Sequence, residues 1–361
     1  MATEAHAEAV PRKPKRRRPT SQLLVTVAGL SLVAIVVAWL VVNLVKDWST
    51  FLQLSFFGLT RGSTYALVAL GYTLVYGILE LINFAHGDVF MIGGMIAATF
   101  AINIFSLGVN PALGTLVLVI IVALAAATIG CGLLNATIER IAYRPLRGAP
   151  RLVPLITAIG MSFILEDVAF IWKGPRPVSL PLETLPHGVI FTLGTCPKCA
   201  TFRWDQLFVV LVTVPVLIGL VWLVQFTQRG KAMRATAQDK DAAAMMGIDV
   251  DRTISFTFLV AGGLAGVAGV IFTFYGTTIQ FNTGFSIGLI AFTAAVLGGI
   301  GNLPGAVLGG LLIGFIQDFN EGLSWHAPGS AWSQSIVFAI LILILVFRPQ
   351  GLLGEHTPEG G

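Results

Sequence analysis

The chain has 361 residues, of which 55% are hydrophobic and only 11% are charged. Soluble domains carry roughly 25% charged residues, so this composition excludes a soluble globular protein, as well as disordered, collagenous and disulfide-rich secreted chains. The formal net charge is +4. It does not indicate nucleic-acid binding, because the basic residues lie in an N-terminal arm and in loops, where the positive-inside rule places them in membrane proteins.

The N-terminal 20 residues form a polar arm that contains six Lys and Arg residues between positions 12 and 18. We expect this arm to lie on the cytoplasmic side, against anionic lipid. A nuclear or nucleic-acid signal is the weaker alternative. The apolar run 22–45 is longer than the hydrophobic core of a signal peptide and lacks a small-residue cleavage site. Residues 21–49 are therefore predicted to be an extra N-terminal transmembrane helix.

Long charge-free runs follow, and each span needs about 20 apolar residues. They predict an all-α, polytopic helical membrane protein with eight to ten transmembrane helices. The expected spans are 22–45, 62–82, 88–106, 112–136, 152–172, 207–226, 253–275, 287–300, 304–317 and 331–348. Residues 51–60 are apolar but too short to span, which favours an interfacial or re-entrant segment. The short pair 287–300 and 304–317 is also compatible with two half-helices.

Loop charges predict the orientation of these spans. With the basic arm inside, the Arg-rich loop 137–151, the basic segment 227–252 and the tail 354–361 fall on the cytoplasmic side. The loop 173–206 falls outside, although it carries four basic residues of its own. The main transmembrane domain is expected to cover residues 50–353.

The three cysteines do not predict a metal site. Cys131 lies in an expected span and is interpreted as a packing residue. Cys196 and Cys199 form a Cys-x-x-Cys pair in the outer loop, where a local disulfide is the favoured interpretation. Zinc binding is an alternative, but the pair supplies only two of the usual four ligands. A thioredoxin-like redox role has no surrounding βαβ pattern to support it.

Two glycine- and asparagine-containing stretches are expected to interrupt helices. The first runs from Glu80 to Asp88 and contains Asn83, His86 and Gly87. The second follows Gly298, and its helix-break candidates are Gly301, Asn302, Pro304 and Gly305. Interrupted segments in the two halves of a transporter are typical of a substrate path. The alternative for the first stretch is a short loop with polar groups at the membrane interface.

The basic segment 227–252 has an alanine-rich centre followed by Met245 and Met246. This pattern favours a short helix, ended by Gly247, that presents an adaptable apolar surface to a partner. The alternative is a solvated connecting helix. The same segment contains the only Gly-Lys pair of the chain, but Ala232 follows it in place of Ser or Thr. It is therefore not an ATP-binding loop, and any ATP dependence must come from a partner.

Several long motifs resemble the permeases of branched-chain amino acid ABC importers, of the LivH type. The matching stretches are Gly62–Met95, Ile138–Met161, Arg229–Arg252 and Ala291–Gly314, in the order of that family. The likeness runs from about residue 51 to 353. The N-terminal arm and helix, and the cysteine-containing part of the outer loop, lie outside the family core.

The resemblance implies residues for two roles. The ABC coupling pattern Glu-Ala-Ala-x-x-x-Gly is matched from Asp241 to Gly247, with Asp in place of Glu and without the closing Leu-Pro. The implied ATPase-coupling residues are Arg234, Asp241, Ala242, Ala243 and Gly247. The candidates for the substrate path are Tyr65, Tyr72, Asn83, His86, Phe292 and Thr293.

The resemblance also implies a transport subunit of the bacterial inner membrane with no enzyme activity and no cofactor. Its expected partners are two ABC ATPase subunits, a LivM-like second permease or a second copy of itself, a periplasmic substrate-binding protein and membrane lipid. Permeases for urea, short amides or small organic acids are the alternative within the family. A secondary transporter is less favoured: Glu80, His86, Asp88, Glu166 and Asp167 could form its ion relay, but it would not need the segment 229–252. No metal motif supports a membrane enzyme.

Overall fold

The computed structural model describes residues 20–150, 152–181, 184–186, 188–195, 198–348 and 350–354. It divides into two units, one of residues 1–48 and one of residues 49–361. The first unit contains helix α1 (Thr20–Lys46). The predicted basic arm lies outside the described residues except for its last position, so its location stays a prediction. The tail 355–361 is also outside them.

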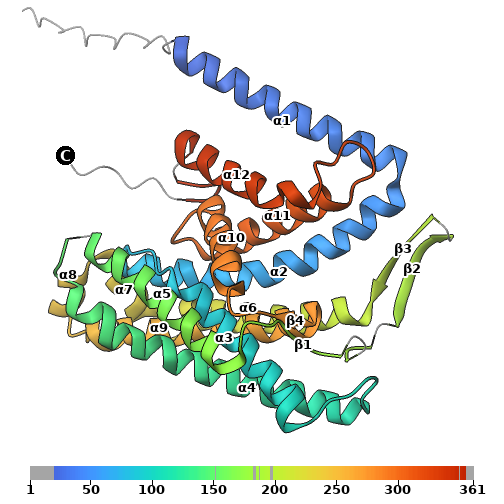
Figure 1. Cartoon of the computed structure of the whole chain (residues 1–361). Coiled ribbons are helices and arrows are strands. Elements are labelled where there is room, and N and C mark those ends of the chain that lie inside the picture. Colours follow the sequence, from blue (N-terminus) through green and yellow to red (C-terminus); the bar gives the residue numbers. More distant parts are fainter. Residues whose placement is uncertain are drawn as a thin grey trace, which may run out of the picture. The chain divides into compact units, whose positions relative to one another are not determined.

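The second unit is built almost entirely of helices (Figure 1). In chain order its elements are α2 (Trp48–Leu79), α3 (Ala85–Ala98), the π-type turn η1 (Thr99–Ile104), α4 (Leu113–Ile138), the π-type turn η2 (Glu139–Tyr143), the 3₁₀ turn η3 (Arg144–Leu146), α5 (Leu152–Lys173), β1 (Val178–Ser179), β2 (Val189–Thr195), β3 (Lys198–Arg203), α6 (Trp204–Phe226), α7 (Gln228–Gln238), α8 (Lys240–Met245), α9 (Val250–Gly276), β4 (Thr278–Ile279), α10 (Thr283–Gly298), α11 (Leu303–Gly322), the 3₁₀ turn η4 (Ser330–Trp332) and α12 (Ser333–Phe347).

Eight helices within the described residues are long and apolar enough to cross a membrane. This confirms the predicted polytopic helical fold and agrees with the expected eight to ten spans. Helix α10 and the stretch Ala34–Lys46 of α1 are shorter apolar helices. Of the short pair at 287–317, the second member therefore belongs to a helix of spanning length, α11, and the first belongs to the shorter α10.

Residues 51–60 do not form a separate segment, so that prediction was wrong. They belong to α2, which continues for 32 residues. Arg61 ends the apolar run in the sequence and made the segment look too short to span. In the structure, its guanidinium forms ion pairs with Asp318 at 3.1 Å and with Glu321 at 3.0 Å, both on α11. Partners of opposite charge allow a charged residue to lie within an interior helix.

Close helix contacts at glycines hold the centre of the second unit together. Helix α3 packs against α4, α5, α9 and α10, and nearly all of its residues are buried. A Cβ atom on Gly93 would lie 2.7 Å from the Cα of Gly266 on α9. Such an approach of two backbones requires small residues on both sides. The glycines of α9 therefore act in helix packing.

The loop 173–206 contains short strands that the sequence patterns did not predict. Strands β2 and β3 pair antiparallel, and β1 pairs with β4. Phe191 and Phe202 stack across the β2–β3 pair with ring centroids 5.3 Å apart. Every residue of β2 is exposed, so the usual alternation of buried and exposed residues is missing from its sequence.

The cysteines follow two different patterns. Cys131 is free and buried, and its thiol donates to the Val89 carbonyl at 3.3 Å, which fits a packing role. Cys199 lies in β3 and is disulfide-bonded. Cys196, its predicted partner, lies outside the described residues.

Candidate functional site

The first helix interruption lies between α2 and α3. Helix α2 ends at Leu79 and α3 begins at Ala85, with Glu80 in the left-handed conformation at φ 56°. Gly87, predicted as a break residue, instead lies inside α3. A Cβ atom on Gly87 would lie 2.7 Å from the Cα of Gly288. This glycine therefore allows α10 to approach α3, and the prediction is corrected in that respect.

The second interruption lies where the sequence placed it, between α10 and α11. Gly299 and Gly301 have φ angles of 108° and 94°, which side chains rarely adopt. The Asn302 side chain accepts a hydrogen bond from the Gly305 N–H at 3.0 Å and caps α11. Pro304 lies in the first turn of that helix, where its missing N–H costs nothing.

The C-terminal segment 350–354 completes this second interruption. The backbone N–H groups of Leu352 and Leu353 donate to the carbonyls of Leu297 and Gly298 at 2.8 and 3.0 Å. The Asn302 amide donates to the Leu353 carbonyl at 2.8 Å. Terminal carbonyls of α10 that would lack partners are thereby satisfied. The sequence patterns did not indicate this contact.

Four of the six substrate-path candidates lie close together beside the first interruption. The Tyr72 ring lies edge-on to the His86 ring at 4.9 Å and to the Phe292 ring at 6.0 Å between centroids. Asn83 joins them through the chain, and its side-chain oxygen accepts a hydrogen bond from the hydroxyl of Tyr143 at 2.7 Å. Tyr143 was not among the predicted residues.

The other two candidates are placed differently. Tyr65 is buried on α2, two helical turns before Tyr72. Thr293 is fully buried, and its hydroxyl donates to the Leu289 carbonyl within α10 at 2.9 Å. Its donor is therefore already used inside its own helix.

His86 and Asp88 are both fully buried in the first turn of α3. The Ser162 hydroxyl, on α5, donates to one Asp88 oxygen, while the other oxygen has no partner in the part of the chain described. Within the described residues, neither nitrogen of the His86 imidazole has a hydrogen-bond partner. Buried polar groups without partners are costly at membrane depth and mark functional positions.

The space beside this cluster is small. Tyr72 and Phe292 line a pocket of about 10 Å³ together with Tyr76, Leu81, Ile82, Ala295 and Ile300. A cavity of that size holds no more than about one water molecule. A substrate path at these residues therefore needs a second surface or a different conformation.

The segment between α6 and α9 forms two short helices with side-chain caps. The Thr227 hydroxyl accepts from the Gly230 N–H at 3.0 Å and caps α7. The Asp239 carboxylate accepts from the N–H groups of Asp241 and Ala242, both at 2.9 Å, and caps α8. The coupling candidate Asp241 lies in the first turn of α8, where the helix dipole favours negative charge.

Helix α8 ends as the sequence predicted. Gly247 adopts φ 85°, and the Ile248 N–H donates to the Ala243 carbonyl at 3.1 Å. This is the arrangement of a glycine-terminated helix. Ala243 is 4% exposed, whereas Met245 and Met246 are each 83% exposed. Helix α8 therefore packs against the rest of the protein through Ala243 and exposes the two methionines.

Helix α7 is fixed to the end of α6. The Arg234 guanidinium donates to the Val224 carbonyl at the end of that helix. A Cβ atom on Gly230 would overlap the carbonyl oxygens of Leu223 and Val224, so only glycine permits this approach. The sequence interpretation noted Gly230 only as part of a failed ATP-binding motif.

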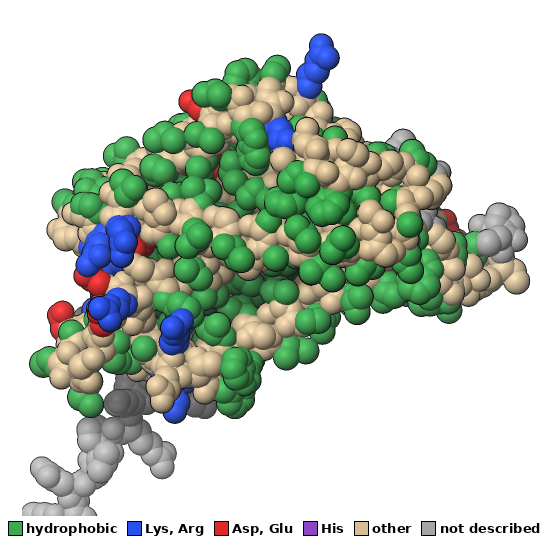
Figure 2. All heavy atoms as spheres, turned by 90° about the horizontal axis from the view of Figure 1, so that it is seen from below, with side chains coloured by type: hydrophobic (Ala, Val, Ile, Leu, Met, Phe, Trp, Pro, Cys, Tyr) green, Lys and Arg blue, Asp and Glu red, His purple; other side chains and the backbone are tan. Residues whose placement is uncertain are grey.

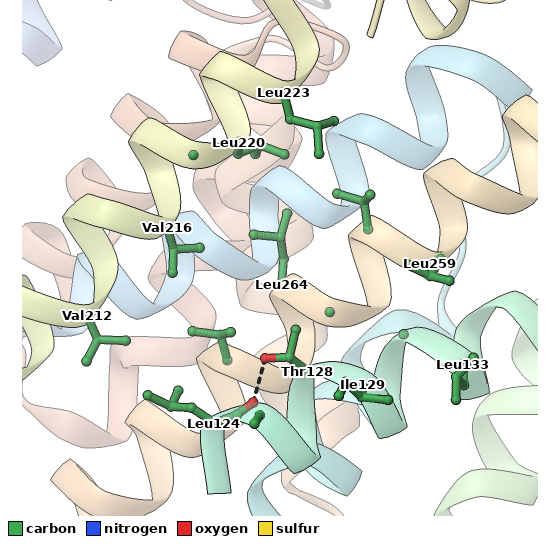
Figure 3. Close-up of a pocket in the computed structure, with 16 residues that line it drawn as sticks. Leu124, Thr128, Ile129, Leu133, Val212, Val216, Leu220, Leu223, Leu259 and Leu264 are labelled. Carbon is green, nitrogen blue, oxygen red and sulfur yellow. Dashed lines mark hydrogen bonds between the residues drawn. The ribbon is translucent and has the colours of Figure 1, made fainter. Parts of the chain in front are cut away.

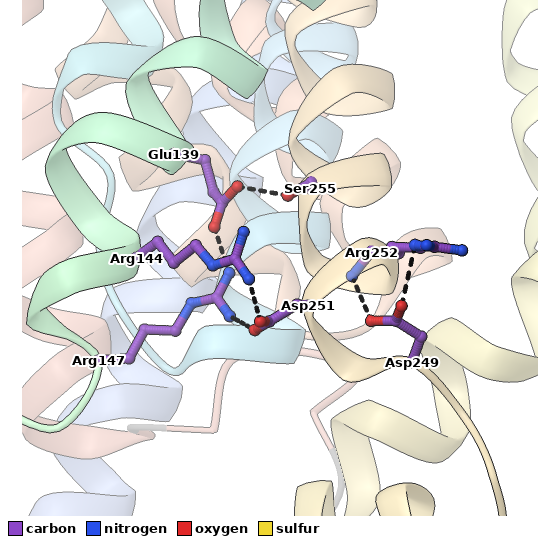
Figure 4. Close-up of polar contacts among 7 residues, drawn as sticks. All are labelled: Glu139, Arg144, Arg147, Asp249, Asp251, Arg252 and Ser255. Atoms are coloured by element: carbon purple, nitrogen blue, oxygen red, sulfur yellow. Dashed lines mark hydrogen bonds and ion pairs between the residues drawn. The ribbon is translucent and has the colours of Figure 1, made fainter.

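A charged network ties the end of α4 to the start of α9 (Figure 4). The fully buried Glu139 carboxylate accepts from Arg147 and from the Ser255 hydroxyl, the latter at 2.6 Å. Arg144 and Arg147 both ion-pair with Asp251 on α9. The sequence interpretation used the charges of this loop only for orientation and missed the network. Asp251 follows α8 by six residues, so the network fixes the chain directly after the short helix.

The first interruption, the charged loop and α8 meet at one pocket of about 200 Å³. It is lined by Leu79, Glu80, Leu81, Arg147, Ala149, Pro154 and Lys240. Lys240 is the first residue of α8. The start of α8 and the interruption between α2 and α3 therefore border the same pocket.

Comparison with known proteins places this geometry in context. Residues 54–346 match the family model described as "Branched-chain amino acid transport system / permease component". The permease protein BraD of the high-affinity branched-chain amino acid transport system of Pseudomonas aeruginosa is 40% identical over 309 residues, covering 86% of this chain and 97% of BraD. LivH of Escherichia coli K12 is 39% identical, with the same coverage. Among solved structures, PsaBC from Streptococcus pneumoniae in complex with Fab aligns over 87% of this chain and 97% of its own, with a TM-score of 0.40 and 14% identity.

Proposed function

Because this chain belongs to the family of branched-chain amino acid transport permeases, we propose that it is the transmembrane permease subunit of an ATP-driven importer for branched-chain amino acids. The observation that carries this proposal is the similarity to BraD and LivH, which extends over 86% of the chain. That alignment covers 97% of BraD and 97% of LivH. Urea, short amides and small acids are correspondingly less favoured as substrates.

Helix α8 is the part that receives the ATPase subunits in this proposal. Its two exposed methionines offer flexible, polarizable side chains that adapt to a groove. The Asp239 cap and the left-handed Gly247 hold both ends of the helix. A short, capped helix transmits displacement better than an unstructured loop, because its side chains keep their positions. Two separate ATPase subunits would hydrolyse ATP.

The motion would pass from α8 to the helix interruption. Lys240 of α8 shares a pocket with Glu80 and Leu81, and Arg147 joins this pocket to the start of α9 through Asp251. Displacement of α8 would then move α3 and α9 together, as required for a rigid-body change of access.

The substrate path would lie where Tyr72, His86 and Phe292 meet. The pocket at this place is only about 10 Å³ within one chain, which is too small for an amino acid. We therefore place the path between this chain and a second permease, either a LivM-like subunit or another copy. The aromatic rings would contact the apolar side chain of the substrate, and buried polar groups would contact its charged ends.

In this arrangement, the end of the protein that carries α7 and α8 faces the cytoplasm, as does the N-terminal arm. The outer strands β1 to β3 face a periplasmic binding protein, in the inner membrane of a bacterium. The basic charge of the loop 137–151 and of the segment 227–252 supports this orientation.

Retention of the ATPase subunits tests the role of α8. The tagged chain is co-expressed with its transport partners and purified, and the bound ATPase is measured. Gly247→Asp should abolish retention, because an L residue at φ 85° is strained and distorts the end of α8. Gly148→Asp is the matched control, since Gly148 has open space around its Cβ position and an ordinary φ angle. Equal retention by both variants would contradict the role of α8.

A further inference from the structure

A groove with a volume of about 740 Å³ runs between α4, α6 and α9 on the outer surface of the second unit (Figure 3). We call it the lateral groove. It is lined by α4 between Leu124 and Leu133, by α6 between Val212 and Leu223, and by α9 between Leu259 and Val267. Figure 2 shows a face hollowed between hydrophobic side chains, with Lys and Arg side chains gathered towards one end beside Asp and Glu side chains.

The lateral groove has the chemistry of a hydrocarbon site. Thr128 is its only lining residue with a polar side chain, and the Thr128 hydroxyl donates to the Leu124 carbonyl at 2.6 Å within α4. Its walls belong to three helices of membrane-spanning length. The groove therefore offers no hydrogen bond to a polar ligand and lies where lipid chains surround the protein.

Two arginines lie beyond the end of the groove that is closest to α7. Arg140 follows the lining residue Leu133 by two helical turns, and Arg229 follows Leu223 after the end of α6. Both are exposed, and within the described residues neither forms an ion pair with a carboxylate. The Arg229 guanidinium lies 4.6 Å from the ring centroid of Phe256, one turn before Leu259 on α9. This contact holds the cation next to the groove.

The groove is large enough for an extended hydrocarbon chain. It has a volume of about 740 Å³ and runs along α6 from Val212 to Leu223.

We propose that the lateral groove binds one anionic phospholipid. An acyl chain lies between α4, α6 and α9, and the phosphate is bound by Arg140 and Arg229. An apolar lining, with two arginines at one end that have no carboxylate partner among the described residues, matches the two parts of such a lipid. A basic site next to transmembrane helices is typical of anionic headgroup binding. The lipid would fill the space between α6 and α9 next to the end that carries α7.

The proposal is tested with the full chain purified in detergent, by native mass spectrometry during titration with dioleoyl phosphatidylglycerol or dioleoyl phosphatidylcholine. The wild-type chain should retain one phosphatidylglycerol and bind phosphatidylcholine more weakly. Replacing Arg140 and Arg229 with Gln should lower the affinity for phosphatidylglycerol by roughly fivefold for each arginine and remove the preference. Arg176→Gln, in the outer loop, is the charge control and should change neither affinity.

A second variant tests the groove itself. Among the described residues, no neighbouring atom lies within 4 Å of a Cβ on Gly219 or on Gly160 of α5, so both positions accept a larger side chain without a clash. Gly219→Leu should fill the groove and lower the affinity for both lipids, whereas Gly160→Leu should leave both unchanged. Unaltered lipid binding by Gly219→Leu would overturn the proposal. So would equal binding of the two lipids by the wild-type chain, or a crosslink from Gly219→Cys to a neighbouring permease subunit, which would make the groove a protein interface.

Discussion

Arg147 forms an ion pair with Glu139, a carboxylate with no exposed surface at the end of α4. The same guanidinium pairs with Asp251 at the start of α9. One side chain therefore joins two membrane-spanning helices at the end of the protein where α7 and α8 lie. Its two partners differ greatly in exposure. The Glu139 side chain is fully buried, whereas the Asp251 side chain is 47% exposed.

Arg147→Ala should destabilise the protein strongly. The substitution leaves Glu139 buried with only the Ser255 hydroxyl as a partner, and loss of one partner of a buried ion pair costs about 3–5 kcal/mol. Thermal unfolding in detergent, followed by circular dichroism, measures the effect. Arg252→Ala is the control, because the Arg252 side chain is 89% exposed beside Asp249, and a surface pair contributes about 0–1 kcal/mol. Equal unfolding temperatures for the two variants would contradict the importance of the network.

Gly310→Ala should loosen the contact between α2 and α11. A Cβ atom at Gly310 would lie 2.5 Å from the Cα of Ala66, so the helices must separate at a cost of about 1–3 kcal/mol. The midpoint of thermal unfolding should fall. Gly160→Ala, with open space at its Cβ, should leave the midpoint unchanged or raise it. A Gly310→Ala variant as stable as the wild type would show that α2 and α11 pack less closely than described.

Replacing Met245 and Met246 with Ser should separate binding from stability. Both side chains are 83% exposed, so the unfolding midpoint should change little. Affinity for the ATPase subunits should fall by at least an order of magnitude, because exposed apolar anchors carry much of the energy of such interfaces. Val109→Ser, 64% exposed at the opposite end of the spans, should leave that affinity intact. The prediction fails if both variants bind the ATPase as tightly as the wild type.

Tyr143→Phe should weaken the polar cluster beside the first interruption. The variant removes the donor that Asn83 accepts at 2.7 Å, and an unsatisfied buried acceptor costs about 1–3 kcal/mol. We expect lower stability and slower uptake. Tyr275→Phe is the control, since Tyr275 is only partly buried and lies near the C-terminal end of α9, away from this cluster. Uptake and stability at wild-type levels in Tyr143→Phe would remove Asn83 from the proposed path.

Features set by local sequence were predicted well. The charge-free runs identified the membrane-spanning helices, and Gly247 and Asn302 were correctly placed at helix ends, because capping and left-handed glycine are local properties. The grouping of Tyr72 with His86 and Phe292 came from position within the resembling stretches. In the structure, the centroid of the Tyr72 ring lies 4.9 Å from that of His86 and 6.0 Å from that of Phe292.

Features that depend on distant partners were missed. Arg61 looked like the end of a span because its partners on α11 are 257 and 260 residues away in the chain. The same holds for Glu139 with Ser255, and for Asn302 with Leu353, which is 51 residues further along the chain. Gly87 was assigned to a break because its glycine requirement comes from the neighbouring α10 and not from its own backbone angles. Local patterns cannot reveal requirements that arise only from tertiary contacts.

Uptake of labelled leucine tests the central claim most directly. Cells that lack this chain but retain its transport partners are complemented with the intact chain, Gly247→Asp or Gly148→Asp, and urea and benzoate are assayed in parallel. The account predicts that the intact chain and Gly148→Asp restore leucine uptake and that Gly247→Asp, although present in the membrane, does not. Restoration of urea or benzoate uptake in place of leucine uptake would contradict it.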